Sequence, residues 1–207
     1  MAGHGPAIFV GDAMALDFLN SVATPVDTPI DWIDSGDGLV HWLDQAGLVP
    51  ADALKSIRTQ ALPGELDKVA RRARELREWF RGFVDDHVGR PLVVETLREL
   101  EPLNRLLAQD EMFGRIVLRK TKAVSLAFEV QRRWRSPESL FLPIAEALAQ
   151  FICTEEFSRV KACEGDACTL VFADHTRGQA RRWCSMAICG NRAKQAAYRQ
   201  RLRAGQR

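Results

Sequence analysis

The stretch that decides the fold of the C-terminal part runs from Cys163 to Arg203 and reads CEGDACTLVFADHTRGQARRWCSMAICGNRAKQAAYRQRLR. Two short cysteine pairs, far apart in sequence, are a common source of four thiolates for a tetrahedral zinc ion. The spacing therefore predicts a structural zinc site, while two disulfides or an iron–sulfur cluster remain as alternatives. The predicted ligands follow the pattern Cys163-x4-Cys168-x15-Cys184-x4-Cys189.

The segments around the cysteines indicate how such a site is built. Residues 169–183 predict a strand, a turn at Gly178 and a second strand, and the Ala-, Arg- and Gln-rich residues after Cys189 predict a helix. Together these elements make a treble-clef-like zinc module. His175 is expected in a turn and Cys153 on the apolar face of a preceding helix, so neither is expected to bind the metal. A segment this short and polar cannot bury a core, so metal is expected to stabilise it.

Charge is distributed unevenly along the chain, although the net charge is only +2. Residues 1–54 contain eight aspartates and neither lysine nor arginine, whereas residues 177–207 contain nine basic residues and no acidic one. So many positive charges on one small unit repel one another unless a polyanion neutralises them or solvent screens them. The module is therefore predicted to bind nucleic acid, and a solvated basic helix with no nucleic-acid role is the alternative. The predicted contacts are Arg177, Arg181, Arg182, Asn191, Arg192, Lys194, Arg199, Arg201 and Arg203.

Two interpretations stay open for Asn191 and Arg192. Both residue types suit base edges, adenine for Asn and guanine for Arg. Alternatively, Asn191 caps the last helix and Arg192 pairs with Asp174 to hold the module together. Contacts to phosphates alone are a further alternative.

The rest of the chain predicts a mainly helical domain with minor β structure, an α+β fold. The clearest helix covers residues 65–87, where apolar residues recur at three- and four-residue steps. Residues 115–131 alternate and are β-rich, with a turn at Lys120-Thr121-Lys122. The predicted domains are residues 1–155, mostly helical, and residues 156–207, the zinc module.

A second segment has the helix–turn–helix pattern of a DNA reader, residues 39–58. Residues 31–54 hold five aspartates and no basic residue, so phosphates would repel this surface. DNA binding is therefore not expected there.

The helical domain is expected to bind or sense rather than to catalyse. The sequence contains no phosphate-binding loop, dinucleotide fingerprint, zinc-protease motif or nucleophile elbow. Asp17 and Asn20 lie among apolar residues and need polar partners if buried, and Arg77 could supply one. This trio predicts either a buried network that fixes the fold or a pocket for a small-molecule effector. Homodimerisation through the 65–87 helix is a further hypothesis.

Neither a secretory signal nor an apolar run long enough to cross a bilayer is recognisable. We therefore expect a cytoplasmic protein without membrane contact, in which cysteines are more often free or metal-bound than bridged.

The cysteine module resembles the CGNR zinc-finger family, named for the tetrapeptide that stands here at residues 189–192. Phe172, Asp174, the RRWCSM run at 181–186 and the NRAK run at 191–194 match as well. Near the N-terminus, LDFLNS at residues 16–21 resembles the LDFxNT motif of the ABATE domain, with Ser21 in place of Thr. Together the two resemblances cover nearly the whole chain.

These resemblances imply a bacterial, stress-linked transcription regulator with a zinc finger that binds DNA. The prediction is a DNA-binding regulator whose N-terminal domain senses a ligand or dimerises. The alternative is a protein- or RNA-interaction module with a structural zinc ion.

Overall fold

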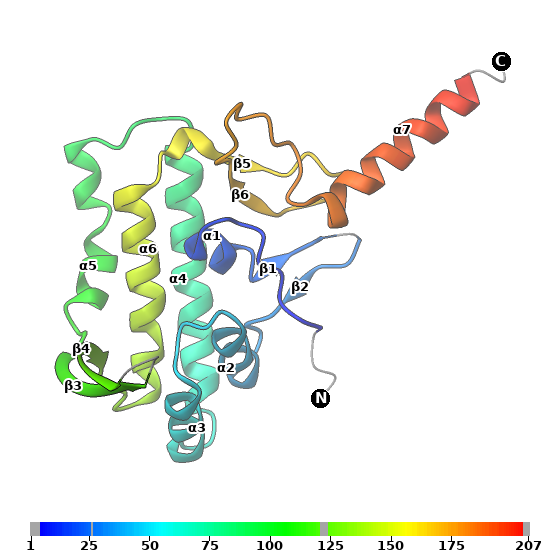
Figure 1. Ribbon diagram of the computed structural model, residues 1–207. Helices are drawn as coiled ribbons and strands as arrows, with labels where there is room; N and C mark the ends of the chain where they lie inside the picture. Colours follow the sequence, from blue (N-terminus) through cyan, green and yellow to red (C-terminus); the bar gives the residue numbers. More distant parts are fainter. Residues whose placement is uncertain (1–4, 26, 121–123, 205–207) are drawn as a thin grey trace.

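The computed structural model describes residues 5–25, 27–120 and 124–204. Figure 1 shows a helical body, a two-stranded hairpin (β3, β4) at one end, and a C-terminal module from which the last helix extends away. The α-helices are α1 Met14–Leu19, α2 Gly36–Gln45, α3 Ala51–Gln60, α4 Glu65–His87, α5 Glu101–Leu107, α6 Phe141–Thr154 and α7 Asn191–Ala204. Short 3-10 helices are η1 Val94–Arg98, η2 Pro137–Leu140 and η3 Phe157–Arg159, and η4 Met186–Gly190 is a π-turn. The mainly helical fold with minor strand content is confirmed.

Helix α4 forms the centre of the body. Its residues at three- and four-residue steps, such as Val69, Ala73 and Phe80, are buried, as the sequence pattern predicts. The helix contacts α1 and α2, and Phe80 meets Phe151 of α6 edge to face, with ring centroids 5.9 Å apart. This packing uses the apolar face of α4 inside the domain, so the helix does not offer that face to a second copy.

The strands form three separate antiparallel pairs. They are β1 Val22–Ala23 with β2 Ile30–Asp31, β3 Met112–Lys120 with β4 Val124–Arg132, and β5 Val160–Ala162 with β6 Val171–Ala173. The β-rich segment of the sequence is the long hairpin β3–β4, whose predicted turn residues Thr121 and Lys122 lie outside the described residues.

One hydrophobic core runs through both parts of the chain. Leu170, Phe172 and Ala173 of the cysteine module are fully buried and belong to the same cluster as Leu16 of α1 and Phe80 of α4. The C-terminal module therefore packs on the helical body rather than hanging from a linker. The division near residue 155 stays a prediction.

Three local expectations were wrong. The hairpin of the cysteine module does not follow Cys168: β5 precedes the first cysteine pair, β6 follows it, and the strand expected after Gly178 does not form. Asp174, just after β6, binds Lys161 of β5 and the backbone around the turn, which holds that segment as an irregular loop. In addition, β1 and β2 form within residues 22–37, a polar, proline-containing segment whose sequence predicts a loop, and Cys153, expected on the apolar face of its helix, is exposed.

Among the described residues, no helix is both long and apolar enough to cross a membrane.

Candidate metal centre and its attachment to the helical body

The first cysteine pair closes the tip of the β5–β6 hairpin. Cys163 follows β5 directly, and its amide donates to the carbonyl of Leu170 across the hairpin at 2.9 Å. The amide of Cys168 donates to the carbonyl of Gly165 at 3.0 Å, so the loop turns back on itself. Gly165 is required by space: a Cβ there would lie 2.6 Å from the sulfur of Cys189. Apart from its place between two cysteines, nothing in the sequence marks this glycine as necessary.

The second cysteine pair lies at the start of the C-terminal helical segment. The hydroxyl of Ser185 accepts a hydrogen bond from the amide of Ile188 at 3.0 Å and so caps the π-turn η4. The amide of Cys189 donates to the carbonyl of Ser185 at 3.2 Å. Because Ser185 caps this segment, the expected capping role of Asn191 is not needed, and Asn191 is instead the first residue of α7.

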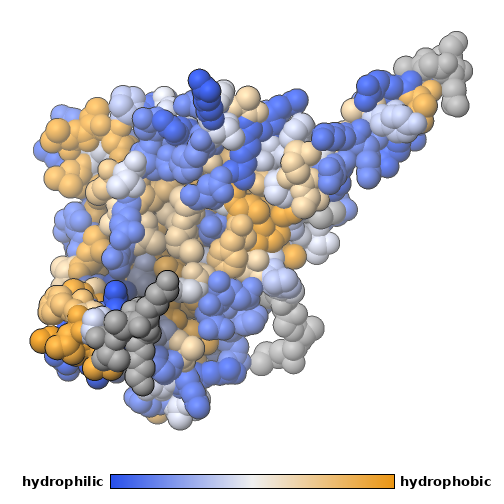
Figure 2. Space-filling model, in the orientation of Figure 1, coloured by the Kyte–Doolittle hydropathy of each residue, from blue (hydrophilic) through white to orange (hydrophobic). Residues whose placement is uncertain are grey.

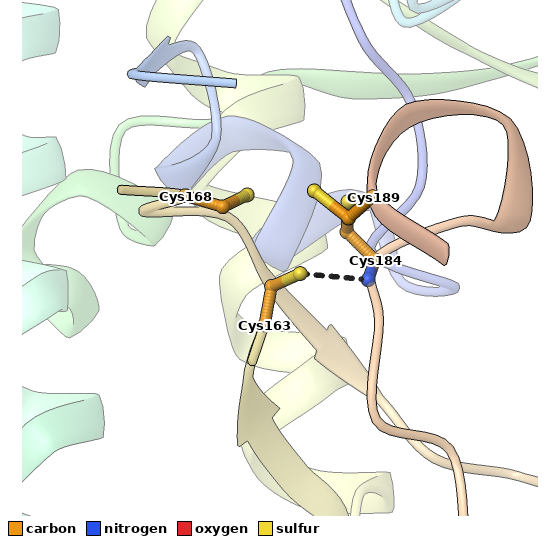
Figure 3. A group of neighbouring side chains, drawn as sticks. All are labelled: Cys163, Cys168, Cys184 and Cys189. Atoms are coloured by element: carbon orange, nitrogen blue, oxygen red, sulfur yellow. Dashed lines mark hydrogen bonds between the residues drawn. The ribbon is translucent and has the colours of Figure 1, made fainter. Parts of the chain in front are cut away.

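These two loops bring the four cysteines together (Figure 3). The sulfur atoms of Cys163, Cys168, Cys184 and Cys189 all lie within 4.8 Å of one another. Four sulfurs bound to one zinc ion at about 2.3 Å are about 3.8 Å apart, so the cluster has the size of such a site. All five cysteines of the chain are described and free of disulfides.

The electrostatics of the cluster favour a bound cation. Burial, reinforced by the neighbouring cysteines, raises the pKa of Cys184 far above its ordinary value and that of Cys189 to about 12. Burial also acts on Cys163, but the amides of Cys184 and Gly165 donate to its sulfur at 3.1 and 3.4 Å and lower its pKa overall. Four thiolates at this distance repel one another strongly, and a dication removes that repulsion. The donor set and its surroundings thus fit zinc.

The module is attached to the body by a reciprocal pair of hydrogen bonds. The side-chain amide of Asn20, just after α1, donates to the carbonyl of Val171 at 2.8 Å, and its oxygen accepts from the amide of Val171 at 2.9 Å. Asn20 thereby completes the hydrogen bonding of β6, almost wholly out of solvent at 2% exposure.

Comparison with known families identifies both parts. Residues 12–155 match the ABATE family, described as "Putative stress-induced transcription regulator". The chain belongs to the ABATE family. Residues 159–202 match the CGNR zinc finger, and the four clustered cysteines within them form a possible metal site that is consistent with zinc. A search of the curated proteins found no match.

Arg181 of the CGNR finger is the second attachment to the ABATE domain. Its guanidinium pairs with Asp12 and donates to the carbonyl of Val10 at 2.9 Å, while lying 4.0 Å from the ring centroid of Phe172. It also donates to the carbonyl of Cys184, one of the four clustered cysteines. Its hydrogen-bonding capacity is therefore used within the chain, and the structure gives this predicted DNA contact a positioning role.

Asp174 holds the loop that carries Arg181. Burial raises the pKa of its carboxyl group, but hydrogen bonds from Lys161, from the amide and hydroxyl of Thr176 and from the amide of Arg181 outweigh burial and hold the pKa below its usual range. Arg192 does not pair with Asp174, as one interpretation expected: it donates to the carbonyl of Pro25 at 3.2 Å.

The other predicted nucleic-acid residues are exposed. Arg182 contacts Glu164 at 2.6 Å and keeps more than half of its side chain in solvent. Arg201 donates to the carbonyl of Ala197 in its own helix. The remaining ones have no ion-pair partner within the described part of the chain: Arg177, Lys194, Arg199 and Arg203. Lys194, Arg199 and Arg203 lie on the projecting helix α7, whose surface is largely hydrophilic in Figure 2.

The predicted pocket residues are buried but do not meet in one site. Asp17 accepts from the amides of residues 10 and 11, both at 2.8 Å. Arg77 instead forms a two-pronged pair with Asp31 at 2.8 and 2.9 Å and donates to Ser21. The expected common network of Asp17, Asn20 and Arg77 is thus three separate networks, each of which joins segments of the fold.

Open space lies elsewhere in the ABATE domain. A surface cavity of about 1000 Å³ lies between α2 and α3. Acidic and basic side chains share its rim, and Arg58 pairs with Asp37 there at 3.0 Å. The sequence analysis did not find this cavity, because it depends on how the two short helices pack.

Proposed function

We propose that the chain regulates transcription by binding duplex DNA through α7 and the adjoining basic loop of the CGNR finger. The observation that carries this proposal is the exposed basic helix, which projects from a zinc-tied base (Figure 1). Lys194, Arg199 and Arg203 have no acidic partner among the described residues, so their charges are free to meet phosphates.

Helical periodicity arranges these charges around an apolar centre. Arg199 and Arg203 are one turn apart on one side, and Lys194 and Arg201 share the other side at a spacing of seven residues. Between the two lies an exposed pair one turn apart, Tyr198 and Leu202. A helix of 14 residues is about 21 Å long and narrow enough for the major groove, which spans about 12 Å.

The experiment compares two variants with the same loss of charge. Arg199→Gln with Arg203→Gln should lower affinity for duplex DNA by about tenfold to a hundredfold and reduce the log–log salt slope by about 2, since each phosphate contact contributes about one unit. The control changes two exposed arginines of the helical body, Arg90→Gln with Arg98→Gln.

Fluorescence anisotropy with a labelled duplex at several salt concentrations measures both quantities. An equal loss in the control would show that only total charge matters, against a specific interface. Absence of duplex binding by the wild type at low salt would refute the proposal, and stronger binding of RNA would favour the interaction-module alternative.

The remaining parts of the proposal concern the role of the ABATE domain, the cellular compartment and the oligomeric state. We infer a non-enzymatic role in a bacterial stress response, in the cytoplasm, with a homodimer as the active form. An effector site belongs to this proposal, and the cavity between α2 and α3 offers the space that the side chains of Asp17, Asn20 and Arg77 do not.

A further inference from the structure

The hairpin β3–β4 has one face made of apolar side chains that nothing in the described chain covers. Cross-strand partners share a face, and the register pairs Ile116 with Phe128 and Leu118 with Leu126. Ile116 and Phe128 are each 70% exposed, and Met112, Leu118, Leu126 and Val130 are about half exposed or more. Figure 2 shows hydrophobic side chains gathered at this end of the body.

The opposite face of the hairpin is mixed, with Phe113, Val117 and Ala127 half-buried among charged side chains. It carries Arg115 and the cross-strand pair Arg119–Glu129, whose charged atoms are 3.3 Å apart. An antiparallel sheet normally turns its more apolar face toward a core. Apart from each other, the two strands make few contacts with any other described element, and an isolated two-stranded hairpin is only marginally stable in water. The apolar face is therefore built to be covered.

A glycine, Gly114, leaves room on that face for an aromatic ring. A Cβ at Gly114 would lie 2.3 Å from the ring of Phe128, so the ring lies over the glycine on the same face. This arrangement gives a continuous apolar surface without a gap in the strand. It also explains a glycine inside a strand, which otherwise weakens it.

We propose that this face is the homodimer interface and that its occupant is the same face of a second copy. A two-fold interface must be self-complementary. The face meets that condition because the six exposed side chains named above carry no charge, and Ile116 and Phe128 among them can pack against the same pair. The inference deepens the proposed homodimer by naming its surface.

The area agrees with this assignment. At these exposures the six side chains leave roughly 600–700 Å² of apolar surface, more than the largest patch of a typical monomer, about 300–600 Å². Two such faces would bury about 1,200–1,400 Å², within the range of specific interfaces, about 1,200–2,000 Å². The hairpin lies at the end of the body away from α7, so a dimer leaves both basic helices free (Figure 1).

Size-exclusion chromatography with light scattering tests the proposal on the full chain with zinc. We expect the wild type at twice the chain mass of 23.2 kDa. Ile116→Thr with Phe128→Thr removes apolar area and places threonine, a β-branched residue that suits a strand, at both positions, and this variant should have the mass of one chain. The control, Val93→Thr with Val94→Thr, changes two exposed valines outside the hairpin and should stay dimeric.

A monomeric wild type at all concentrations overturns the proposal, whatever else covers the face, and so does a folded Ile116/Phe128 variant that stays dimeric. If this variant does not fold, hydrogen exchange of the wild type decides. Protection of the β3 and β4 amides should rise with concentration, and protection independent of concentration would overturn the dimer. These readouts do not involve DNA, so the interface and the DNA-binding proposal can fail independently.

Discussion

Replacing Asn20 with alanine tests how the ABATE domain holds the CGNR finger. The change removes two hydrogen bonds, at 2.8 and 2.9 Å, and leaves the amide and carbonyl of Val171 without partners. Each bond contributes about 1 kcal/mol net, and a stranded buried group costs about 1–3 kcal/mol. Since Asn20 is almost fully buried, we expect a loss of about 2–4 kcal/mol in the free energy of unfolding.

Urea unfolding at fixed excess zinc, followed by tryptophan fluorescence, measures this loss. Thr169→Val is the matched control, because it removes the hydrogen bond from the amide of Thr24 to the Thr169 hydroxyl, an exposed link between the same two segments. The control should lose no more than about 1 kcal/mol. A loss below about 1 kcal/mol for Asn20→Ala would refute the reasoning, because the buried pair would then matter no more than the exposed link.

Two further predictions concern single residues. Burial raises the pKa of Asp17 to about 6, against the opposing hydrogen bonds from Gly11 and Val10, so the folded protein binds this proton more tightly than the unfolded chain. The stability from this group is full below about pH 4 and is lost as the pH rises through about 6, and from pH 5 to 7.5 the wild type should lose about 1–1.5 kcal/mol relative to Asp17→Asn. Urea unfolding of both proteins across this range checks the sign, and parallel pH profiles would contradict it. Gly165→Ala should weaken zinc binding at least tenfold in a chelator competition, because its Cβ would meet the sulfur of Cys189, whereas Gly178→Ala, where a Cβ has open space, should not. Equal zinc affinity in the two glycine variants would show that the loop yields without cost.

Spacing and periodicity were sufficient for the main features of this fold. The cluster of four cysteines followed from their paired spacing, and α4 followed from its apolar residues at helical steps. The helix after Cys189 followed from propensity alone. These features depend on local sequence, which is why they could be predicted.

The hydrogen-bond and ion-pair partners of polar groups could not be predicted from the sequence in the same way. Asn20 meets Val171, 151 positions later, and Arg181 reaches Asp12, 169 positions earlier. Pairings at such separation depend on the packing of the whole core, which the local sequence does not show. The charge of Arg181 therefore predicted a DNA contact, whereas its guanidinium lies against the helical body. Arg77 likewise pairs with Asp31 and not with Asp17, because β2, and not α1, places a carboxylate beside the Arg77 guanidinium.

The projecting helix α7 acts mechanically as a lever. It is about 21 Å long, and its main contacts with another described element, those with η4, lie at its N-terminal end. A tilt of about 10° at that end moves the other by about 4 Å, close to the step of about 3.4 Å between base pairs. Substitutions that shift the seat of the finger, at Asn20 or Asp12, should therefore change which phosphates Arg203 reaches, although they lie far from any nucleic acid.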